Sequence, residues 1–332
     1  MHRLVSLGEI MLRLSPPKYE RLRRATTLGV RPCGAQFNVA ANFTALGGAS
    51  TFLTRLPDNE LGYLGRAFGE SCGVNMSNAR LVDNPKIGIV FLEFSMAPRR
   101  QVHLYDRNGS AAATTEAGDF AWEQLLPGAH YAYTDGIFPA LSKQTEQTTL
   151  TFLEQAKAAG CETCFDVNYR ESLWTRQQAL RLYRRALPLV DILVTNRDVS
   201  ESVFGYLGSD EDLLRTYQRD FGCRLVCLTY KEMSSLLHGR WWSLALYQDM
   251  VFTGQYYEFD VVDPYGAGDA FFAGLLFTLA ESGSVQTALD FGNALCALAH
   301  TLEGDQATVS RAEVEALVAA IAAGDISFTS RR

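Results

Sequence analysis

The chain has 332 residues, of which 47% are hydrophobic and 20% charged, so it can bury a large core and should be globular. Its formal net charge is −7, and no basic field would attract nucleic acid or an anionic membrane surface. The composition therefore favours a small-molecule partner and disfavours nucleic acid and membrane partners.

The N-terminus and the cysteines both favour a cytoplasmic protein. The opening "MHRLVSLGEIMLRL" lacks the apolar core of a signal peptide, and no window holds the roughly 20 apolar residues of a membrane span. The seven cysteines are scattered, mostly among apolar residues, which is typical of buried thiols. Cys161 and Cys164 form a C-x-x-C in a strand-like segment, which disfavours a redox pair, and the spacing disfavours zinc as well.

Short apolar strands alternate with helical patterns along the chain, which predicts an α/β fold with a mostly parallel sheet and crossover helices. The expected strands cover residues 3–8, 50–56, 131–136, 163–168, 191–196 and 225–230. The expected helices cover residues 36–46, 59–71, 141–159, 176–187, 211–220, 269–282, 285–302 and 310–323.

Several of these strands end in polar residues. Because open α/β sheets bind ligands beyond the carboxyl ends of their strands, we expect four side chains to face one crevice: Asp135, Asp166, Asn168 and Asn196.

Two stretches, 10–32 and 86–106, interrupt the alternation. The second contains two β-runs around a Pro-Arg-Arg turn. Together they predict a small separate sheet within a single domain spanning 1–332. The apolar run "IGIVFLEF" must be covered, by the mouth of the crevice or by a second copy of the chain. We therefore expect a lid, and a homodimer formed through it.

The segment "DPYGAGDAFFAGLL" (263–276) joins a glycine-rich turn to an apolar helix. Gly266 and Gly268 leave main-chain N–H groups accessible, and the helix adds its own free N–H groups and positive dipole end, which makes an anion cradle. We expect the dipole to keep Asp269 ionised, so that it can accept a proton from a hydroxyl. Taken alone, the segment is more typical of an ordinary turn and helix cap than of a catalytic site.

Four further segments accompany this one in a consistent order. The segment at 263–276 resembles the D-x-x-G-A-G-D motif of the PfkB, or ribokinase-like, carbohydrate kinases. Its companions are "GEIMLRLSPP" (8–17), "CGAQFNVAANFTALGG" (33–48), "FDVNYRESLW" (165–174) and "DILVTNRDVSESVFG" (191–205). The resemblance covers essentially the whole chain. It implies a ribokinase-like three-layer α/β/α sandwich with a β-sheet lid, and phosphorylation of a sugar hydroxyl with ATP and Mg²⁺.

The resemblance also implies roles for individual residues. Asp269 would be the catalytic base, and Gly266, Ala267 and Gly268 would form the anion hole for the transferred phosphoryl group. The absence of G-x-x-x-x-G-K-[ST] excludes a P-loop kinase, and the absence of D-F-G and H-R-D motifs excludes a protein kinase.

For the substrate, Tyr105, Arg107 and Arg170 match positions that hold the acidic sugar in 2-keto-3-deoxygluconate kinases. The planar guanidinium of arginine pairs well with a carboxylate. Gly34 and Asn38 would lie beside the sugar hydroxyls, Gly34 because a side chain would crowd the sugar, and Asp166 and Asn168 would complete the pocket. The expected reaction converts 2-keto-3-deoxygluconate to its 6-phosphate.

The nucleotide side departs from the family pattern. Asn196, Thr229 and Asn293 match its nucleotide-binding region, but Val199 replaces the acid of N-x-x-E. A bulky loop containing Tyr230, Lys231 and Met233 replaces a glycine-rich one.

The sugar side departs as well, because Gln36 stands where a Glu is usual and Arg13 lies in the region where neutral-sugar kinases carry an Asp. Two alternatives therefore stay open. One is a fructokinase-like or ribokinase-like enzyme acting on a neutral sugar. The other is a diverged paralogue that binds a sugar or nucleotide without turnover.

Overall fold

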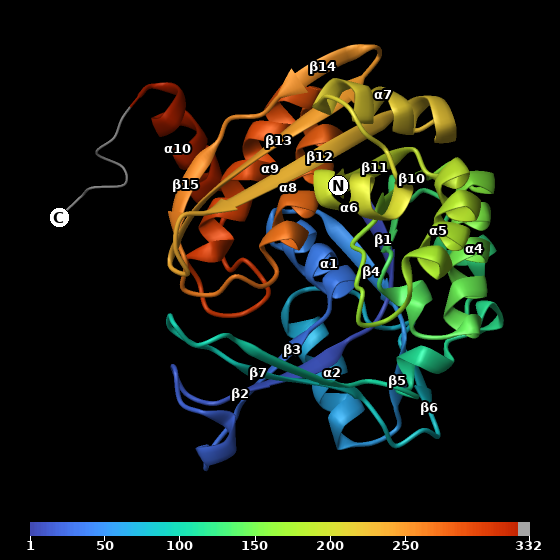
Figure 1. Ribbon diagram of the computed structural model, residues 1–332. Coiled ribbons are helices and arrows are strands. Elements are labelled where there is room, and N and C mark those ends of the chain that lie inside the picture. Colours follow the sequence, from blue (N-terminus) through green and yellow to red (C-terminus); the bar gives the residue numbers. More distant parts are fainter. Residues whose placement is uncertain (325–332) are drawn as a thin grey trace.

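A sheet of nine strands runs through the middle of the computed structural model, which describes residues 1–324 (Figure 1). Its path is β14-β13-β12-β11-β10-β9-β1-β4, with β15 paired to β13, and the six strands from β12 to β4 are parallel. The strands are β1 (Arg3–Leu7), β4 (Ala49–Leu53), β9 (Tyr131–Asp135), β10 (Glu162–Asp166), β11 (Ile192–Asn196), β12 (Leu225–Met233), β13 (His238–Tyr247), β14 (Met250–Thr253) and β15 (Tyr257–Asp260).

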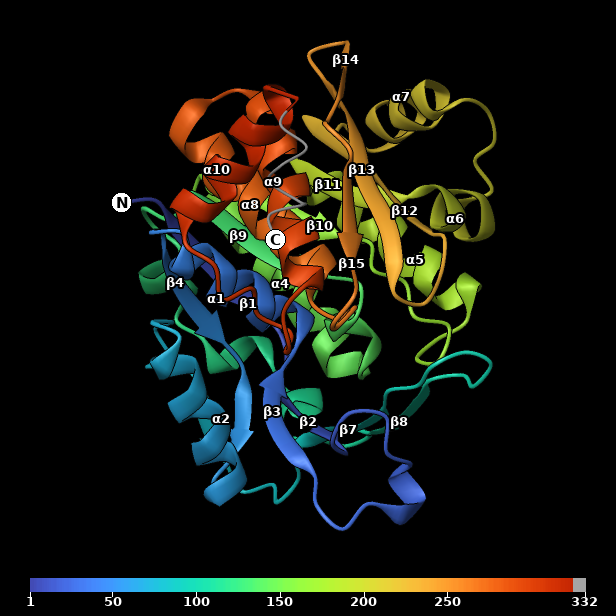
Figure 2. The same cartoon turned by 90° about the vertical axis from the view of Figure 1, so that its left-hand side faces the viewer.

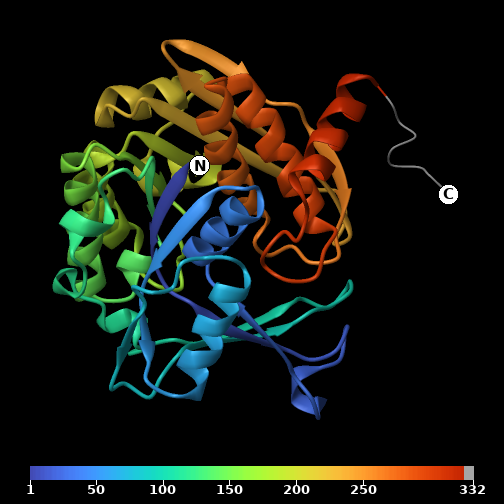
Figure 3. The same ribbon diagram turned by 180° about the vertical axis from the view of Figure 1, so that it is seen from behind.

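Helices cover both faces of this sheet, so alternate residues of each parallel strand enter different cores; Leu4 and Val5 of β1 are an example. This two-sided burial explains why the parallel strands do not alternate regularly between apolar and polar residues. One layer contains α1 (Ala35–Ala45), α8 (Ala267–Ser282), α9 (Val285–His300) and α10 (Arg311–Ala322), seen as the blue, orange and red helices of Figure 3. The other contains α3 (Trp122–Leu125), α4 (Lys143–Ala158), α5 (Arg176–Ala186), α6 (Arg197–Val199) and α7 (Asp210–Phe221). The predicted three-layer α/β/α sandwich is confirmed.

Helix α8 is apolar around its whole circumference because it packs against both α1 and α9. Gly274 of α8 meets Gly292 of α9, and a Cβ at position 274 would lie 3.0 Å from the Cα of Gly292. The close helix contact therefore depends on glycine and fixes the start of α8 relative to the sheet.

The two interrupting stretches form a separate four-stranded sheet, called here the small sheet. Its order is β3-β2-β7-β8, from β2 (Met11–Ser15), β3 (Gly29–Cys33), β7 (Gly88–Glu93) and β8 (Val102–Asp106). It lies beyond the carboxyl end of β1, below the main sheet in Figures 1 and 2, next to α2 (Glu60–Ser71). The predicted small β-sheet is confirmed, and a short pair of β5 (Arg55–Pro57) and β6 (Arg80–Val82) accompanies it.

Strands β13, β14 and β15 were not predicted from the sequence. These strands pair antiparallel at one edge of the main sheet. Residues along β13 alternate between buried and more exposed positions, a period of two that is typical of an antiparallel strand covered on one face. The predicted strand at 225–230 also continues further, because its end pairs with β13.

The seven cysteines are all free thiols. Cys161 comes directly before β10 and Cys164 lies within β10, and both are buried. Among residues 1–324, no helix combines the length and apolar character needed to cross a membrane.

Candidate active site

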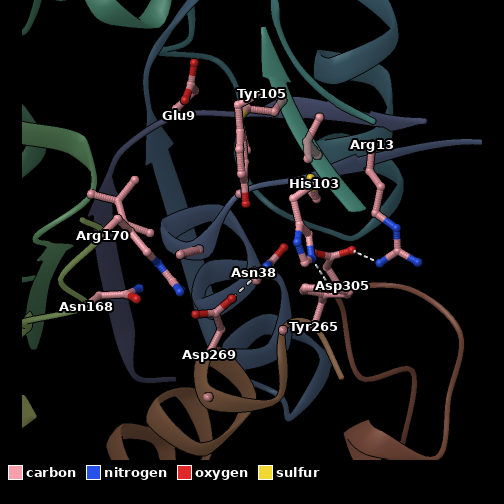
Figure 4. Close-up of a pocket in the computed structure, with 18 of the residues that line it drawn as sticks. Glu9, Arg13, Asn38, His103, Tyr105, Asn168, Arg170, Tyr265, Asp269 and Asp305 are labelled. Atoms are coloured by element: carbon pink, nitrogen blue, oxygen red, sulfur yellow. Dashed lines mark hydrogen bonds and ion pairs between the residues drawn. The ribbon is translucent and has the colours of Figure 1, made fainter. Parts of the chain in front are cut away.

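A pocket opens between the small sheet and the carboxyl ends of the central strands (Figure 4). It brings together residues from distant parts of the sequence. Its lining includes Glu9, Met11, Arg13, Gly34, Gln36, Asn38, Val90, Leu92, Gln101, His103, Tyr105, Arg107, Asp166, Asn168, Arg170, Lys231, Tyr265, Gly266, Gly268, Asp269 and Asp305.

Asp269 lies at the floor of this pocket, in the first turn of α8, and is 9% exposed. Its Oδ2 accepts a hydrogen bond of 2.7 Å from Nδ2 of Asn38 on α1. The carboxylate therefore faces an open space and not its own backbone, as a proton acceptor for a bound hydroxyl requires.

Burial opposes the expected effect of the helix dipole, which favours the ionised form of Asp269. Burial raises the pKa of Asp269 well above its usual range, and the charges of Asp135, Asp166 and Asp305 act in the same direction. Donation by Asn38 opposes this rise but does not reverse it. Burial is the largest of these effects on the pKa of Asp269.

The turn before Asp269 has the geometry that glycine allows. Gly266 has φ 74°, and a Cβ there would lie 1.8 Å from the carbonyl oxygen of Asp305. Gly266 is the N-cap of α8, and no side chain within residues 1–324 caps this helix. The N–H groups of residues 267–269 precede the first helical bond, from Ala270 to Gly266, and are free to meet an anion.

Gly266 and Gly268 line the pocket, and a Cβ at Gly268 would meet no atom within 4 Å. Ala267 is buried, and its side chain points away from the pocket lining. Of the three anion-hole residues, Ala267 can therefore contribute only its main chain.

Asn38 and Gly34 both lie in the pocket, but for reasons that differ from those expected. The Oδ1 of Asn38 accepts a hydrogen bond from Nε2 of Gln306 at 2.6 Å. This bond fixes the Asn38 amide, and its Nδ2 in turn orients the Asp269 carboxylate. At Gly34, a Cβ would lie 2.0 Å from the carbonyl oxygen of Glu9, and φ is 152°. Backbone packing against Glu9 is therefore sufficient by itself to require glycine at this position.

Arg107 forms part of the pocket wall, but its charge is already paired. Its Nη2 forms a buried ion pair with Glu9, whose other oxygen accepts from Oγ of Ser110 at 2.7 Å. The Arg107 guanidinium also lies 5.9 Å from the centre of the Tyr105 ring, and Tyr105 is half-exposed at the pocket edge.

Arg170 differs from Arg107 because, among residues 1–324, it makes no ion pair and no side-chain hydrogen bond. Figure 4 shows its guanidinium pointing into the space beside Asp269, opposite Tyr105. Its charge lowers the pKa of His103 on β8, adding to the effect of burial. The pocket therefore contains an arginine available to an anionic ligand.

Asp135, Asp166 and Asn168 cluster at the ends of β9 and β10. Asp135 is fully buried and accepts hydrogen bonds from the N–H groups of Ile137 and Phe138, so it fixes the turn that follows β9. It also accepts from the side-chain amides of Gln36 and Asn168. Burial, with Asp135 nearby, raises the pKa of Asp166 to about 7. Asp166 and Asn168 line the pocket as expected, and Asp135 lies behind it.

The structure does not bring the three expected nucleotide residues to this pocket. Asn196 uses its side chain to cap α6 by accepting from the N–H of Val199 at 2.9 Å. Thr229 donates to the carbonyl of Thr195. Asn293 is fully buried, and its amide is bonded to Trp241, Ser243 and Gln255.

Several lining residues were not assigned to the site from the sequence. Lys231 borders the pocket, Tyr265 hydrogen bonds with Nε2 of His103, and Asp305 pairs with Arg13. Tyr265 stands inside the D-x-x-G-A-G-D motif, which is the signal that could have identified it. Asp305 lies far from any motif named above, so only the fold reveals it.

Fold and pocket together define a kinase of the ribokinase-like α/β class, with a carboxyl group and free helix N–H groups facing one cavity. Residues 1–312 match the family described as pfkB family carbohydrate kinase, and the chain belongs to this family. It is therefore a sugar kinase, and the resemblance stated from the sequence is confirmed.

Several relatives are similar to almost the whole chain. A 2-dehydro-3-deoxygalactonokinase of Haloferax volcanii is 37% identical over 313 residues, covering 94% of this chain and 95% of the relative. A 2-dehydro-3-deoxygluconokinase of Thermoproteus tenax is 29% identical, covering 96% and 94%. The crystal structure of a 2-dehydro-3-deoxygluconokinase from Thermotoga maritima superimposes with a TM-score of 0.92 and 31% identity, covering 96% and 98%.

Proposed function

We propose that this kinase transfers a phosphoryl group from ATP, with Mg²⁺, to the terminal hydroxyl of a 2-keto-3-deoxy sugar acid. 2-Keto-3-deoxygluconate, also called 2-dehydro-3-deoxygluconate, is the first candidate. The observation that carries the proposal is Arg170, an arginine that points into the pocket with no carboxylate partner in the described part of the chain. A carboxylate of the substrate would complete it.

Asp269 acts as the base in this proposal. The terminal hydroxyl lies above its carboxylate and gives up its proton as the oxygen attacks phosphorus. The N–H groups of residues 267–269 stabilise the negative charge on the transferred group. The bond to Asn38 holds the carboxylate in position and leaves Oδ1 of Asp269 free to meet the hydroxyl.

In this proposal the carboxylate of the substrate binds Arg170, and Tyr105 of the small sheet borders the same pocket. Arg107 contributes less direct charge than expected because Glu9 already neutralises it. Removing Arg107 would also leave a buried unpaired carboxylate, which is strongly destabilising, so Arg170 gives the cleaner test of acid recognition.

Lys231 is the residue that best fits the donor phosphates. It lines the pocket with Gly268 and Asp269, and within residues 1–324 its ammonium has no ion-pair or hydrogen-bond partner. Lys231 is exposed to the pocket and solvent, and partial desolvation by the surrounding chain lowers its pKa. No group of three or more His, Cys, Asp or Glu side chains in the described chain is placed to hold a metal. Mg²⁺ would therefore enter with the nucleotide phosphates, as it often does in kinases.

The C4 epimer, 2-keto-3-deoxygalactonate, is the second candidate, and the name of the Haloferax volcanii relative favours it. A binding protein without turnover is disfavoured because the carboxylate and the free N–H groups of the transfer site are both in place. Neutral sugars are disfavoured because they would leave Arg170 unpaired.

The test is a kinase assay with ATP and Mg²⁺ over matched acids and neutral sugars. It should include 2-keto-3-deoxygluconate, 2-keto-3-deoxygalactonate, gluconate, fructose and ribose. The proposal expects kcat/KM for a 2-keto-3-deoxy acid to exceed that for every neutral sugar by at least about 100-fold, the worth of one charged contact. Preference for fructose or ribose would reject it.

A homodimer through the small sheet is the remaining part of the proposal. The small sheet carries one row of four apolar register partners, one from each strand: Val30, Leu14, Phe91 and Leu104. This row is offset by one residue from the row that lines the pocket, so it belongs to the opposite face of the sheet. Val30 and Leu104 are half-exposed. A second copy would cover this row. Sedimentation should give twice the chain mass, and Leu104→Glu should give a monomer; a monomeric wild type would reject the dimer.

A further inference from the structure

Arg13 is a buried arginine of the small sheet that holds two carboxylates of the main domain. It lies on β2 and is 4% exposed. Its Nη2 pairs with Asp263 and its Nη1 with Asp305, the latter at 2.5 Å. The rings of Phe94 and Tyr265 lie 5.2 Å and 5.6 Å from its guanidinium carbon. The planar fork is thus fixed from several directions.

Both carboxylates belong to the segments that shape the start of α8. Asp263 opens the D-x-x-G-A-G-D segment, and its oxygens accept from the N–H groups of Tyr265 at 3.1 Å and Gly304 at 3.0 Å. Asp305 follows Gly304, and its carbonyl oxygen lies directly against Gly266. The Arg13 guanidinium therefore joins the small sheet to the two segments beside the anion hole, one containing Asp263 and the other containing Asp305.

The charges give this contact a role in phosphoryl transfer. Asp263 and Asp305 stand next to N–H groups that must stabilise a negatively charged phosphoryl group. Two unpaired carboxylates there would oppose that charge, and in a buried site the repulsion would be poorly screened. Burial already raises the pKa of Asp305 to about 6, and Arg13 opposes this rise.

We propose that Arg13 is a positioning residue for phosphoryl transfer: its two-carboxylate bridge holds the turn at Gly266 in place and removes negative charge from behind the anion hole. This inference rests on the kinase function proposed above. It predicts that Arg13 acts on the transition state more than on sugar binding, because the guanidinium faces away from Asp269 and toward Asp305 (Figure 4).

The neighbouring strand offers a matched control. Arg31 on β3 is the register partner of Arg13 and also pairs with the segment after α9, through Glu303 at 2.7 Å. That pair is solvent-exposed, so it should contribute little. Arg13→Ala and Arg31→Ala therefore remove the same side chain from the same sheet, one from a buried bridge and one from a surface pair.

The experiment measures kcat and sugar KM for both variants, below their unfolding temperatures. Arg13→Ala should lower kcat about 30-fold or more while sugar KM changes less than about 3-fold, and Arg31→Ala should match the wild type. Guanidinium ion, below denaturing concentrations, should restore part of the lost kcat, whereas sodium chloride at equal ionic strength should not. A kcat for Arg13→Ala equal to that of the wild type would overturn the inference.

Arg13→Lys serves if the alanine variant does not fold. A lysine keeps the charge but lacks the fork, so kcat should still fall about 5-fold or more with sugar KM nearly constant. Wild-type kcat in this variant would show that the bridge geometry is unimportant.

Hydrogen exchange separates this inference from the kinase proposal. Amides at 263–269 should exchange faster in Arg13→Ala than in Arg31→Ala. Equal exchange in the two variants would show that the Arg13 bridge does not hold this turn. A wild type that phosphorylates no sugar or sugar acid would reject the proposed function, and the exchange comparison would still decide whether Arg13 holds this turn.

Discussion

Nδ2 of Asn38 donates a hydrogen bond of 2.7 Å to Oδ2 of Asp269, and this bond joins α1 to α8 across the pocket floor. Because Oδ1 of Asn38 accepts from Gln306, the amide is held in one orientation. The carboxyl group that the family motif identifies as a base is therefore oriented by a residue more than two hundred positions away in the sequence.

Replacing the base tests the catalytic assignment directly. Asp269→Asn keeps the shape of the side chain but cannot accept a proton, so kcat should fall about 100-fold or more while sugar binding stays measurable by calorimetry. Asp198→Asn, on an exposed part of α6, is the control and should have normal kcat. More than a tenth of wild-type turnover in Asp269→Asn would contradict the assignment.

The raised pKa of Asp269 should appear in the pH profile. A base works only when deprotonated, so kcat/KM should fall toward low pH with a midpoint well above about 4, the usual carboxylate range. Asn38→Ser should move this midpoint to higher pH, because donation by Asn38 lowers the pKa. A profile flat down to that ordinary range would show that Asp269 is not the group titrating.

Two glycines of the turn should respond in opposite ways to the same methyl group. Gly266→Ala places a Cβ against the Asp305 carbonyl at a positive φ and should lower the melting temperature strongly. Gly268→Ala meets no protein atom and should fold normally, yet its methyl enters the space for the phosphoryl group and should reduce kcat. Thermal unfolding and enzyme kinetics, measured on both variants, check the two predictions. Normal activity in Gly268→Ala would show that Gly268 is not part of the anion hole.

Acid recognition should depend on Arg170. Arg170→Gln should raise KM for the sugar acid about 10- to 100-fold, the worth of a charged hydrogen bond, and leave KM for a poor neutral substrate nearly unchanged. The control is Arg181→Gln on the exposed face of α5, which should affect neither KM. Equal losses for acid and neutral substrates would place Arg170 outside the acid site.

Lys231 should act on the nucleotide and not on the sugar. Lys231→Met keeps most of the side-chain stem and removes the charge, so KM for MgATP should rise several-fold, about 10-fold for one charge-assisted contact, with sugar KM unchanged. Lys143→Met, on the surface of α4, should leave both constants unchanged. An unaltered KM for MgATP in Lys231→Met would show that Lys231 does not contact the donor phosphates.

The sequence predicted the elements whose patterns are locally complete. The six parallel strands are short segments buried on both faces, and most of the eight long helices have an apolar and a polar face, so both kinds of element could be recognised in short windows. Helix α8 is recognised instead by its long apolar run after the glycine turn. The edge strands β13 to β15 were missed although β13 alternates, because their pairing partners are supplied only by the fold.

The site divides in the same way. The sequence by itself determined that Asp269 follows a glycine turn at a helix start, because turn and helix are local features of adjacent residues. Only the tertiary structure decided the burial and pairing of the charged groups: Asp269 is buried among other acids, Arg107 is neutralised by Glu9, and Arg13 bridges Asp263 and Asp305. Arg170, within residues 1–324, is left without an ion pair. Electrostatic interactions depend on distance and burial, and residues far apart in sequence acquire both only when the chain folds.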